Sequence, residues 1–156
     1  MKKVLTLIFT LVCSVSLISC SLTDISKSQS QKQSYTGYLS IEGNTLQIDD
    51  FEFQTSKDQA RVQQLGITDT DMPNGYYIHN QTEDVQTFAI DENTQYTFYD
   101  TSNLFIKEED DKRYTTADKQ QFKAFLYRDN EVPLRTPFEI ETEGGRVIAI
   151  TEIFVN

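Results

Sequence analysis

Alternating hydrophobic and polar positions predict a β-hairpin near the start of the folded region. The alternation covers residues 35–42 and 45–54, and Gly43-Asn44 between them tolerates the positive φ angles of a tight turn. The hydrophobic positions change from even to odd numbers between Ile48 and Phe51. Since side chains alternate between the two faces of a strand, a regular strand could not bury both sets on one face. We therefore expect a β-bulge between these two residues.

The remaining alternation predicts further strands and a second hairpin at the C-terminus. The second hairpin consists of residues 136–142 and 146–155 around Glu143-Gly144-Gly145. Its last strand is apolar on both faces, which is typical of a strand inside a sheet. Between the hairpins, short polar turns indicate an antiparallel meander with strands at residues 76–80, 85–90, 95–99 and, with a weaker pattern, 104–107. The core candidates on these strands are Phe88, Ile90, Tyr96 and Phe98.

Two short segments have helical patterns. The first is capped by Ser56, with Gln59 completing a capping box and Gly66 just past its end. The second opens at Thr115 and Asp118 and carries one apolar stripe, which should cover the sheet. The stripe consists of Phe122, Phe125 and Leu126.

The order of elements is ββαβββ(β)αββ, without the alternation of strand and helix that parallel sheets require. The sequence therefore predicts an α+β fold: a strongly curved, mostly antiparallel sheet or small barrel with two short helices.

The N-terminus has the features of an export signal. Lys2 and Lys3 precede an apolar run over residues 4–18, which is too short to span a bilayer core of about 30 Å. Leu17-Ile18-Ser19-Cys20 resembles the lipobox of bacterial lipoproteins, and in that family the cysteine thiol receives a diacylglyceryl group before cleavage. The alternative is an ordinary secretory signal that ends near a cysteine. We expect residues 1–19 to be removed and Cys20 to hold the protein on the extracytoplasmic face of the cell membrane, because two acyl chains suffice for stable anchoring.

Composition divides the mature chain into a tether and one domain. Residues 20–34 are rich in Ser and Gln and cannot form a core, so they are predicted to be a flexible tether. Residues 35–156 have the length of a single extracytoplasmic domain. Loss of the two signal lysines changes the formal net charge from −10 to −12, which disfavours nucleic-acid binding. With Cys13 removed and Cys20 acylated, no thiol remains for a disulfide or a zinc site.

Two stretches resemble a known group of domains. Residues 71–78, Asp71-Met72-Pro73-Asn74-Gly75-Tyr76-Tyr77-Ile78, form the first stretch. Residues 137–140 and 145–152 form the second. Both are similar to a family of small uncharacterised secreted or lipid-anchored domains of Gram-positive bacteria, over roughly residues 46–155. The resemblance implies an anchored compact domain and no catalytic residues.

Candidate catalytic and metal-binding chemistry is sparse. His79 is the only histidine and has no accompanying nucleophile or zinc motif, so a surface strand residue is the favoured interpretation. Asp69-Thr70-Asp71 begins like a calcium loop, but Pro73 and Asn74 break the EF-hand register, and neither this loop nor the acidic run 108–111 is predicted to bind metal. We predict no catalytic residue, metal or cofactor. Carboxylates are numerous enough for a pair to act as in glycosidases, but spacing does not identify one.

Two classes of function remain. The favoured class is a membrane-anchored, non-catalytic binding module for an unidentified envelope component, protein or small ligand. The alternative is a cell-envelope hydrolase that uses paired carboxylates. If the chain binds a ligand, the predicted contact residues are Asp71, Asn74 and Tyr77, because this is the longest loop with defined turn chemistry and loops on rigid scaffolds often carry binding.

Overall fold

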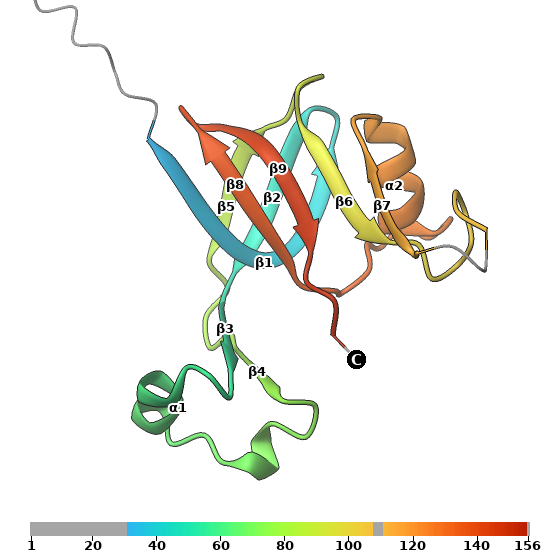
Figure 1. Ribbon diagram of the computed structural model, residues 1–156. Coiled ribbons are helices and arrows are strands. Elements are labelled where there is room, and N and C mark those ends of the chain that lie inside the picture. The colour runs from blue at the N-terminus through green and yellow to red at the C-terminus, as the bar shows by residue number, and fades with distance from the viewer. Residues whose placement is uncertain (1–30, 108–110, 156) are drawn as a thin grey trace, which may run out of the picture.

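The computed structural model describes residues 31–107 and 111–155, which fold as an α+β domain. Figure 1 shows a strongly curved sheet with a separate projection beneath it. The predicted fold class is confirmed. The elements in chain order are β1 (Lys32–Glu42), β2 (Thr45–Asp50), β3 (Glu52–Thr55), α1 (Gln59–Leu65), the 3₁₀ turn η1 (Asp69–Asp71), β4 (Tyr76–His79), β5 (Val85–Ala89), β6 (Gln95–Tyr99), β7 (Arg113–Thr116), α2 (Lys119–Tyr127), β8 (Phe138–Glu143) and β9 (Arg146–Glu152).

The main sheet closes into a small barrel. Its strand order is β5-β2-β1-β8-β9-β6-β7, and a parallel pairing of Ala89 with Arg146 joins β5 to β9. Five strands thereby form a ring in the order β1-β2-β5-β9-β8, with α2 inserted between β5 and β8 along the chain. Closing a sheet into a small barrel covers the strand edges that an open sheet would leave unpaired. Because one barrel topology serves many unrelated functions, the topology alone assigns none here.

Both predicted hairpins are present. β1 and β2 pair around Gly43, whose φ of 59° is the left-handed value that a tight turn needs. β8 and β9 pair around Gly144-Gly145. β9 also pairs with β6, so the strand that is apolar on both faces lies inside the sheet, as predicted.

The core lies inside the barrel and beneath α2. Asp118 begins this helix by accepting a hydrogen bond from the Gln120 N–H at 2.8 Å. The apolar stripe of the helix is fully buried, and the ring of Phe125 stacks on that of Phe98 from β6 at 4.1 Å. Burial of each such side chain stabilises the folded state by roughly 2–3 kcal/mol relative to leaving the side chain exposed. The fully buried residues include Leu46, Ile48, Tyr96, Phe98, Phe122, Phe125, Leu126, Phe138, Ile140 and Ile150.

The predicted bulge after Ile48 is wrong, because the chain changes sheets there. β2 ends at Asp50, and the Phe51 N–H donates to the Thr36 carbonyl at 2.8 Å. β3 then pairs with β4 in a separate two-stranded sheet. The change of hydrophobic phase therefore marks the point where the chain leaves the barrel. Residues 51–83, here called the arm, form the projection below the barrel in Figure 1.

The strands between the hairpins do not form a meander. β4 pairs with β3, β5 pairs with β2, and β6 runs parallel to β9. The expected strand at 104–107 is also wrong. The backbone N–H groups of Leu104, Phe105 and Ile106 donate to the buried Asp100 carboxylate at 2.6–2.8 Å, so they are not available to a neighbouring strand. The partner of β6 is instead β7.

The first helix begins later than predicted. Asp58 precedes α1, and the carboxylate of Asp58 accepts hydrogen bonds from the N–H and hydroxyl of Thr55, both at 2.8 Å. Ser56 lies in the turn before it and does not cap the helix. Gly66 ends the helix with a φ of 69°, as predicted.

The predicted signal at 1–19 and the lipidation site Cys20 lie outside the described residues, as do 108–110 of the acidic run. β1 begins at Lys32, so the barrel includes the last residues of the stretch predicted to be a tether. No helix within the described part of the chain is long and apolar enough to cross a membrane.

Candidate functional site

All three predicted contact residues lie on the arm. Asp71 ends η1 and is exposed, Asn74 is exposed in the following turn, and Tyr77 is half-buried on β4 opposite Gln54. Gly75 between them has a φ of 78°. The structure thus groups the predicted residues on one projection, and their role in binding stays a prediction.

Asp71 also has a structural role. Its Oδ2 atom accepts hydrogen bonds from the side-chain hydroxyl and the backbone N–H of Thr68, at 2.7 and 2.8 Å, which closes a capping box around η1. These two hydrogen bonds hold the pKa of the Asp71 carboxyl below its usual value. Asn74 and Tyr77 are therefore better probes of binding, since a change at Asp71 would also loosen the turn.

The small sheet of the arm has two different faces. On one face, Glu52 accepts two hydrogen bonds from Arg61 of α1, one from Nε at 2.6 Å and one from Nη2 at 2.5 Å. The hydrogen bonding by Arg61 lowers the pKa of the Glu52 carboxyl. On the other face, the rings of Phe53 and Tyr76 stack at 5.4 Å and remain half-buried. The arm therefore presents aromatic surface on one side and an ion pair on the other.

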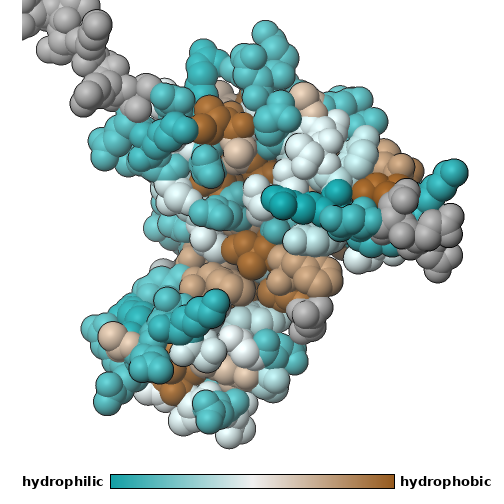
Figure 2. Space-filling view, viewed as in Figure 1, coloured by the Kyte–Doolittle hydropathy of each residue, from teal (hydrophilic) through white to brown (hydrophobic). Residues whose placement is uncertain are grey.

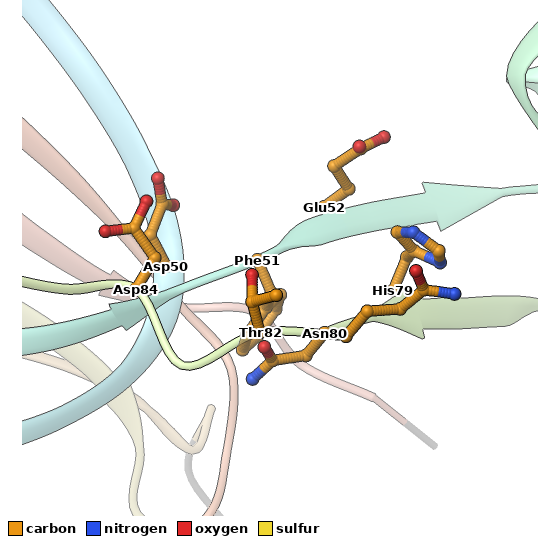
Figure 3. A pocket seen from close by; sticks show the side chains of 8 residues that line it. Asp50, Phe51, Glu52, His79, Asn80, Thr82 and Asp84 are labelled. Carbon is orange, nitrogen blue, oxygen red and sulfur yellow. The ribbon is translucent and has the colours of Figure 1, made fainter.

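A cleft of about 340 Å³ lies where the arm joins the barrel. It is lined by residues 50–52, from the strand entering the arm, and by residues of the returning segment 79–84. Figure 3 shows Asp50 and Asp84 together at one end and His79 with Asn80 at the other. Apart from the change of hydrophobic phase beside Asp50, no pattern along the chain indicates that these residues meet.

The Asp50 end of the cleft is electronegative. Burial raises the pKa of the Asp50 carboxyl, a hydrogen bond from the Thr36 N–H partly opposes this, and the nearby Asp84 and Asp49 raise it further. Asp49 accepts a hydrogen bond from Asn80 at 2.9 Å through Oδ2, while its Oδ1 is buried without a partner. Nevertheless, no group of three or more His, Cys, Asp or Glu side chains within the described residues is arranged to hold a metal ion.

His79 lies opposite Glu52 across the small sheet, with its ring 6.3 Å from that of Tyr77. A general base needs a partner that orients it or a group that it can deprotonate. Within the part of the chain that the structure describes, the imidazole makes no hydrogen bond. His79 therefore has the surroundings of a strand residue at the edge of a cleft.

Many of the carboxylates hold backbone turns. Asp58, Asp71, Asp91, Asp100 and Asp118 all accept backbone hydrogen bonds from nearby residues in sequence. Two other carboxyls, of Asp50 and Glu152, have a raised pKa, and burial is the main cause for both. They line different clefts. A glycosidase needs its two carboxyls on either side of one bond, about 5–10 Å apart.

Comparisons with protein-family models, with curated proteins and with solved structures find no match to this chain.

Proposed function

We propose that this chain is a non-catalytic binding module, anchored through Cys20 at the extracytoplasmic face of the membrane, and that the arm is its recognition element. One observation supports the role of the arm above the others. β2 and β5 are direct neighbours in the barrel, with Asp49 opposite Val85, and the Asp50 N–H donates to the Asp84 carbonyl at 3.0 Å. A two-residue turn between Asp50 and Asp84 would join these strands.

The arm adds little to the stability of the barrel. No residue of 51–83 belongs to the hydrophobic core cluster. α1 buries none of its residues, and the buried side chains of the arm are Phe51, Gln54 and Met72. Ordering a residue costs roughly 1–2 kcal/mol of backbone entropy, so a long insertion that does not fill the core is more readily explained by binding than by folding.

The position of the arm suits a module held at a membrane. The described chain enters β1 at the end of the barrel away from the arm (Figure 1). A lipid on Cys20 and a tether before β1 would therefore hold that end nearer the bilayer. The arm, with Asn74 and Tyr77, would then face outward, where an envelope component or a partner protein can reach it.

The alternative hydrolase is less well supported. Its carboxylate pair would have to come from one cleft, but Asp50 and Glu152 occupy separate clefts. Glu52 shares the cleft of Asp50, yet Arg61 binds both its oxygens and Figure 3 shows its side chain directed away from Asp50. This arrangement favours binding over acid–base chemistry.

Affinity capture from detergent-solubilised cells tests the proposal. The bait is the full chain with Cys20 intact, compared with Asn74→Ala and Tyr77→Ala. The control is Thr87→Ala, an exposed change on β5 outside the arm. We expect both arm variants to lose a partner that the control retains, at an unchanged melting temperature of the barrel. Equal capture by all the variants would argue against the arm as the recognition element.

A further inference from the structure

A second cleft, of about 290 Å³, is lined by residues that all lie outside the arm. It is formed where the end of α2, the loop leading to β8 and the residues after β9 come together. Its polar lining includes Arg128, Arg135, Thr136 and Glu152, and its apolar lining includes Leu134 and Phe154. Two arginines in one cleft are unusual for a chain with a formal net charge of −10.

Arg128 is turned into this cleft by a left-handed backbone. Arg128 and Asp129 have φ values of 44° and 62°, a left-handed conformation that is unfavourable for a residue with a side chain. The guanidinium lies 5.6 Å from the centre of the buried Phe125 ring, and Nη2 donates to the Thr101 hydroxyl at 3.4 Å. The Nε–H of Arg128 is buried without a hydrogen-bond partner. The structure therefore fixes this guanidinium and leaves a donor unused.

Arg135 lines this cleft and also a neighbouring cleft, to which its aromatic partner Tyr38 belongs. Its guanidinium lies 4.4 Å from the centre of the Tyr38 ring, and the side chain is otherwise exposed. Stacking on an aromatic face leaves the N–H groups in the guanidinium plane free to bind other groups. Neither Arg128 nor Arg135 forms an ion pair with a carboxylate among the residues that the structure describes. Within this described part of the chain, both guanidinium groups therefore lack a carboxylate partner, and the N–H groups open to a ligand are those other than the buried Arg128 Nε–H.

Glu152 supplies one negative charge beside the two arginines. Its oxygens already accept hydrogen bonds from the Tyr99 N–H at 2.6 Å and the Thr136 hydroxyl at 3.2 Å. With Glu152 ionised, the three charged side chains of the cleft carry one net positive charge. A singly charged anion suits that balance better than a doubly charged one, because Glu152 repels additional negative charge.

Apolar surface borders the charged groups. Phe154 is 49% exposed, with its ring 4.5 Å from that of Tyr99. In the face that Figure 2 shows, hydrophobic side chains gather where the arm meets the barrel. A ligand that places an anion between the arginines could therefore rest an apolar group against Phe154.

We propose that this cleft binds a single carboxylate group attached to an apolar group, with Arg128 and Arg135 donating to its oxygens. The planar guanidinium fork matches a carboxylate in two-point hydrogen bonding. The carboxylate can come from a small organic acid or from the C-terminus of a peptide with an apolar last residue, which present the same chemistry. This site is separate from the arm and does not depend on the proposed function of the arm.

Calorimetric titration of the full chain in a neutral detergent tests this site. The probes are N-acetylphenylalanine, a pentapeptide ending in phenylalanine, and the C-terminal amide of each. We expect the free acids to bind and the amides to bind at least about tenfold more weakly, because the amide lacks the negative charge that strengthens hydrogen bonds from the arginines. Binding of the peptide alone or of the small acid alone would identify the source of the carboxylate.

Three variants assign the binding to the cleft. Arg135→Gln should weaken binding of the free acid at least about tenfold. Arg135→Lys keeps the charge without the fork and should weaken it less. Arg113→Gln removes the same charge from an exposed position on β7 and should leave binding unchanged. The proposal is wrong if acids and amides bind equally, if neither binds, if inorganic phosphate binds more tightly than the acids, or if Arg113→Gln has the effect of Arg135→Gln.

Discussion

Asp49 of β2 lies directly opposite Val85 of β5, although the whole arm separates these residues along the chain. The two strands therefore pair directly with each other. The barrel core is complete without residues 51–83. Barrel and arm can consequently be altered separately. The predictions below use this separation to distinguish residues that hold the barrel from residues that serve binding.

Two glycines should differ in how much they tolerate a methyl group. A Cβ on Gly37 would lie 2.3 Å from the Asp49 carbonyl oxygen and 2.5 Å from Ile48 Cγ1, inside the barrel wall. A Cβ on Gly75 would meet no atom within 4 Å, although its φ is 78°. We expect Gly37→Ala to lower the free energy of unfolding by about 1–3 kcal/mol or more, and Gly75→Ala by about 1 kcal/mol. Chemical denaturation that ranks Gly75→Ala as the more harmful change would contradict the described path of β1.

Asp100 should stabilise the fold only when ionised. Burial by itself would raise the pKa of this carboxyl, but the N–H groups of Phe105, Ile106 and Leu104 together outweigh burial and hold the pKa below its ordinary 3.8. A lowered folded-state pKa means that this stabilisation is present above about pH 4 and is lost as the pH falls further. Asp100→Asn should lower the free energy of unfolding by about 2 kcal/mol or more at pH 7, because the amide N–H of the asparagine would face a backbone N–H donor. Equal stability of the two proteins at pH 7 would refute this role.

Glu152 should behave in the opposite way. Burial raises the pKa of its carboxyl, and the hydrogen bonds from Tyr99 and Thr136 only partly offset it. The folded state therefore favours the protonated form, and stability falls as the pH rises from the unfolded pKa through the folded one. Glutamine can accept from the Tyr99 N–H and donate to the Thr136 hydroxyl. Thermal unfolding of Glu152→Gln should show an equal or higher melting temperature at pH 7, and a large decrease would contradict the assignment.

The lipid anchor predicts a change of location. Cys20→Ala removes the thiol that would carry the diacylglyceryl group, so the protein should move from the membrane fraction to the medium or remain uncleaved. Cell fractionation with immunoblotting measures this, and Cys13→Ala within the signal is the matched control. Unchanged membrane association with normal processing of Cys20→Ala would rule out lipid anchoring.

Local sequence signals predicted the elements whose partners are adjacent in the chain. Gly43-Asn44 and Gly144-Gly145 specify tight turns, and both hairpins formed around them. Asp118 supplied a true helix cap. In each of these cases, the contacts that determine the element join residues only a few positions apart. Alternation and turn chemistry were therefore sufficient to predict the element.

The errors arose where distant segments decide the structure. The pairing of β2 with β5 spans the arm, and no feature near Ile48 distinguishes a bulge from a change of sheet. Residues 104–107 have a strand-like pattern, but the Asp100 carboxylate accepts hydrogen bonds from the N–H groups of Leu104, Phe105 and Ile106. The second cleft was missed for the same reason, since Arg128 and Glu152 meet only when β9 has joined the barrel.

Replacement of residues 51–83 by Asn-Gly is the most direct test of the account, because it removes the arm and leaves the Asp50–Asp84 closure in place. The measurement is affinity capture from detergent-solubilised cells with this variant and with the intact chain, alongside the melting temperature of each. We predict that the barrel still unfolds in one cooperative transition and that the captured partner is lost. A folded variant that captures the same partner as the intact chain would contradict the claim that the arm is the recognition element.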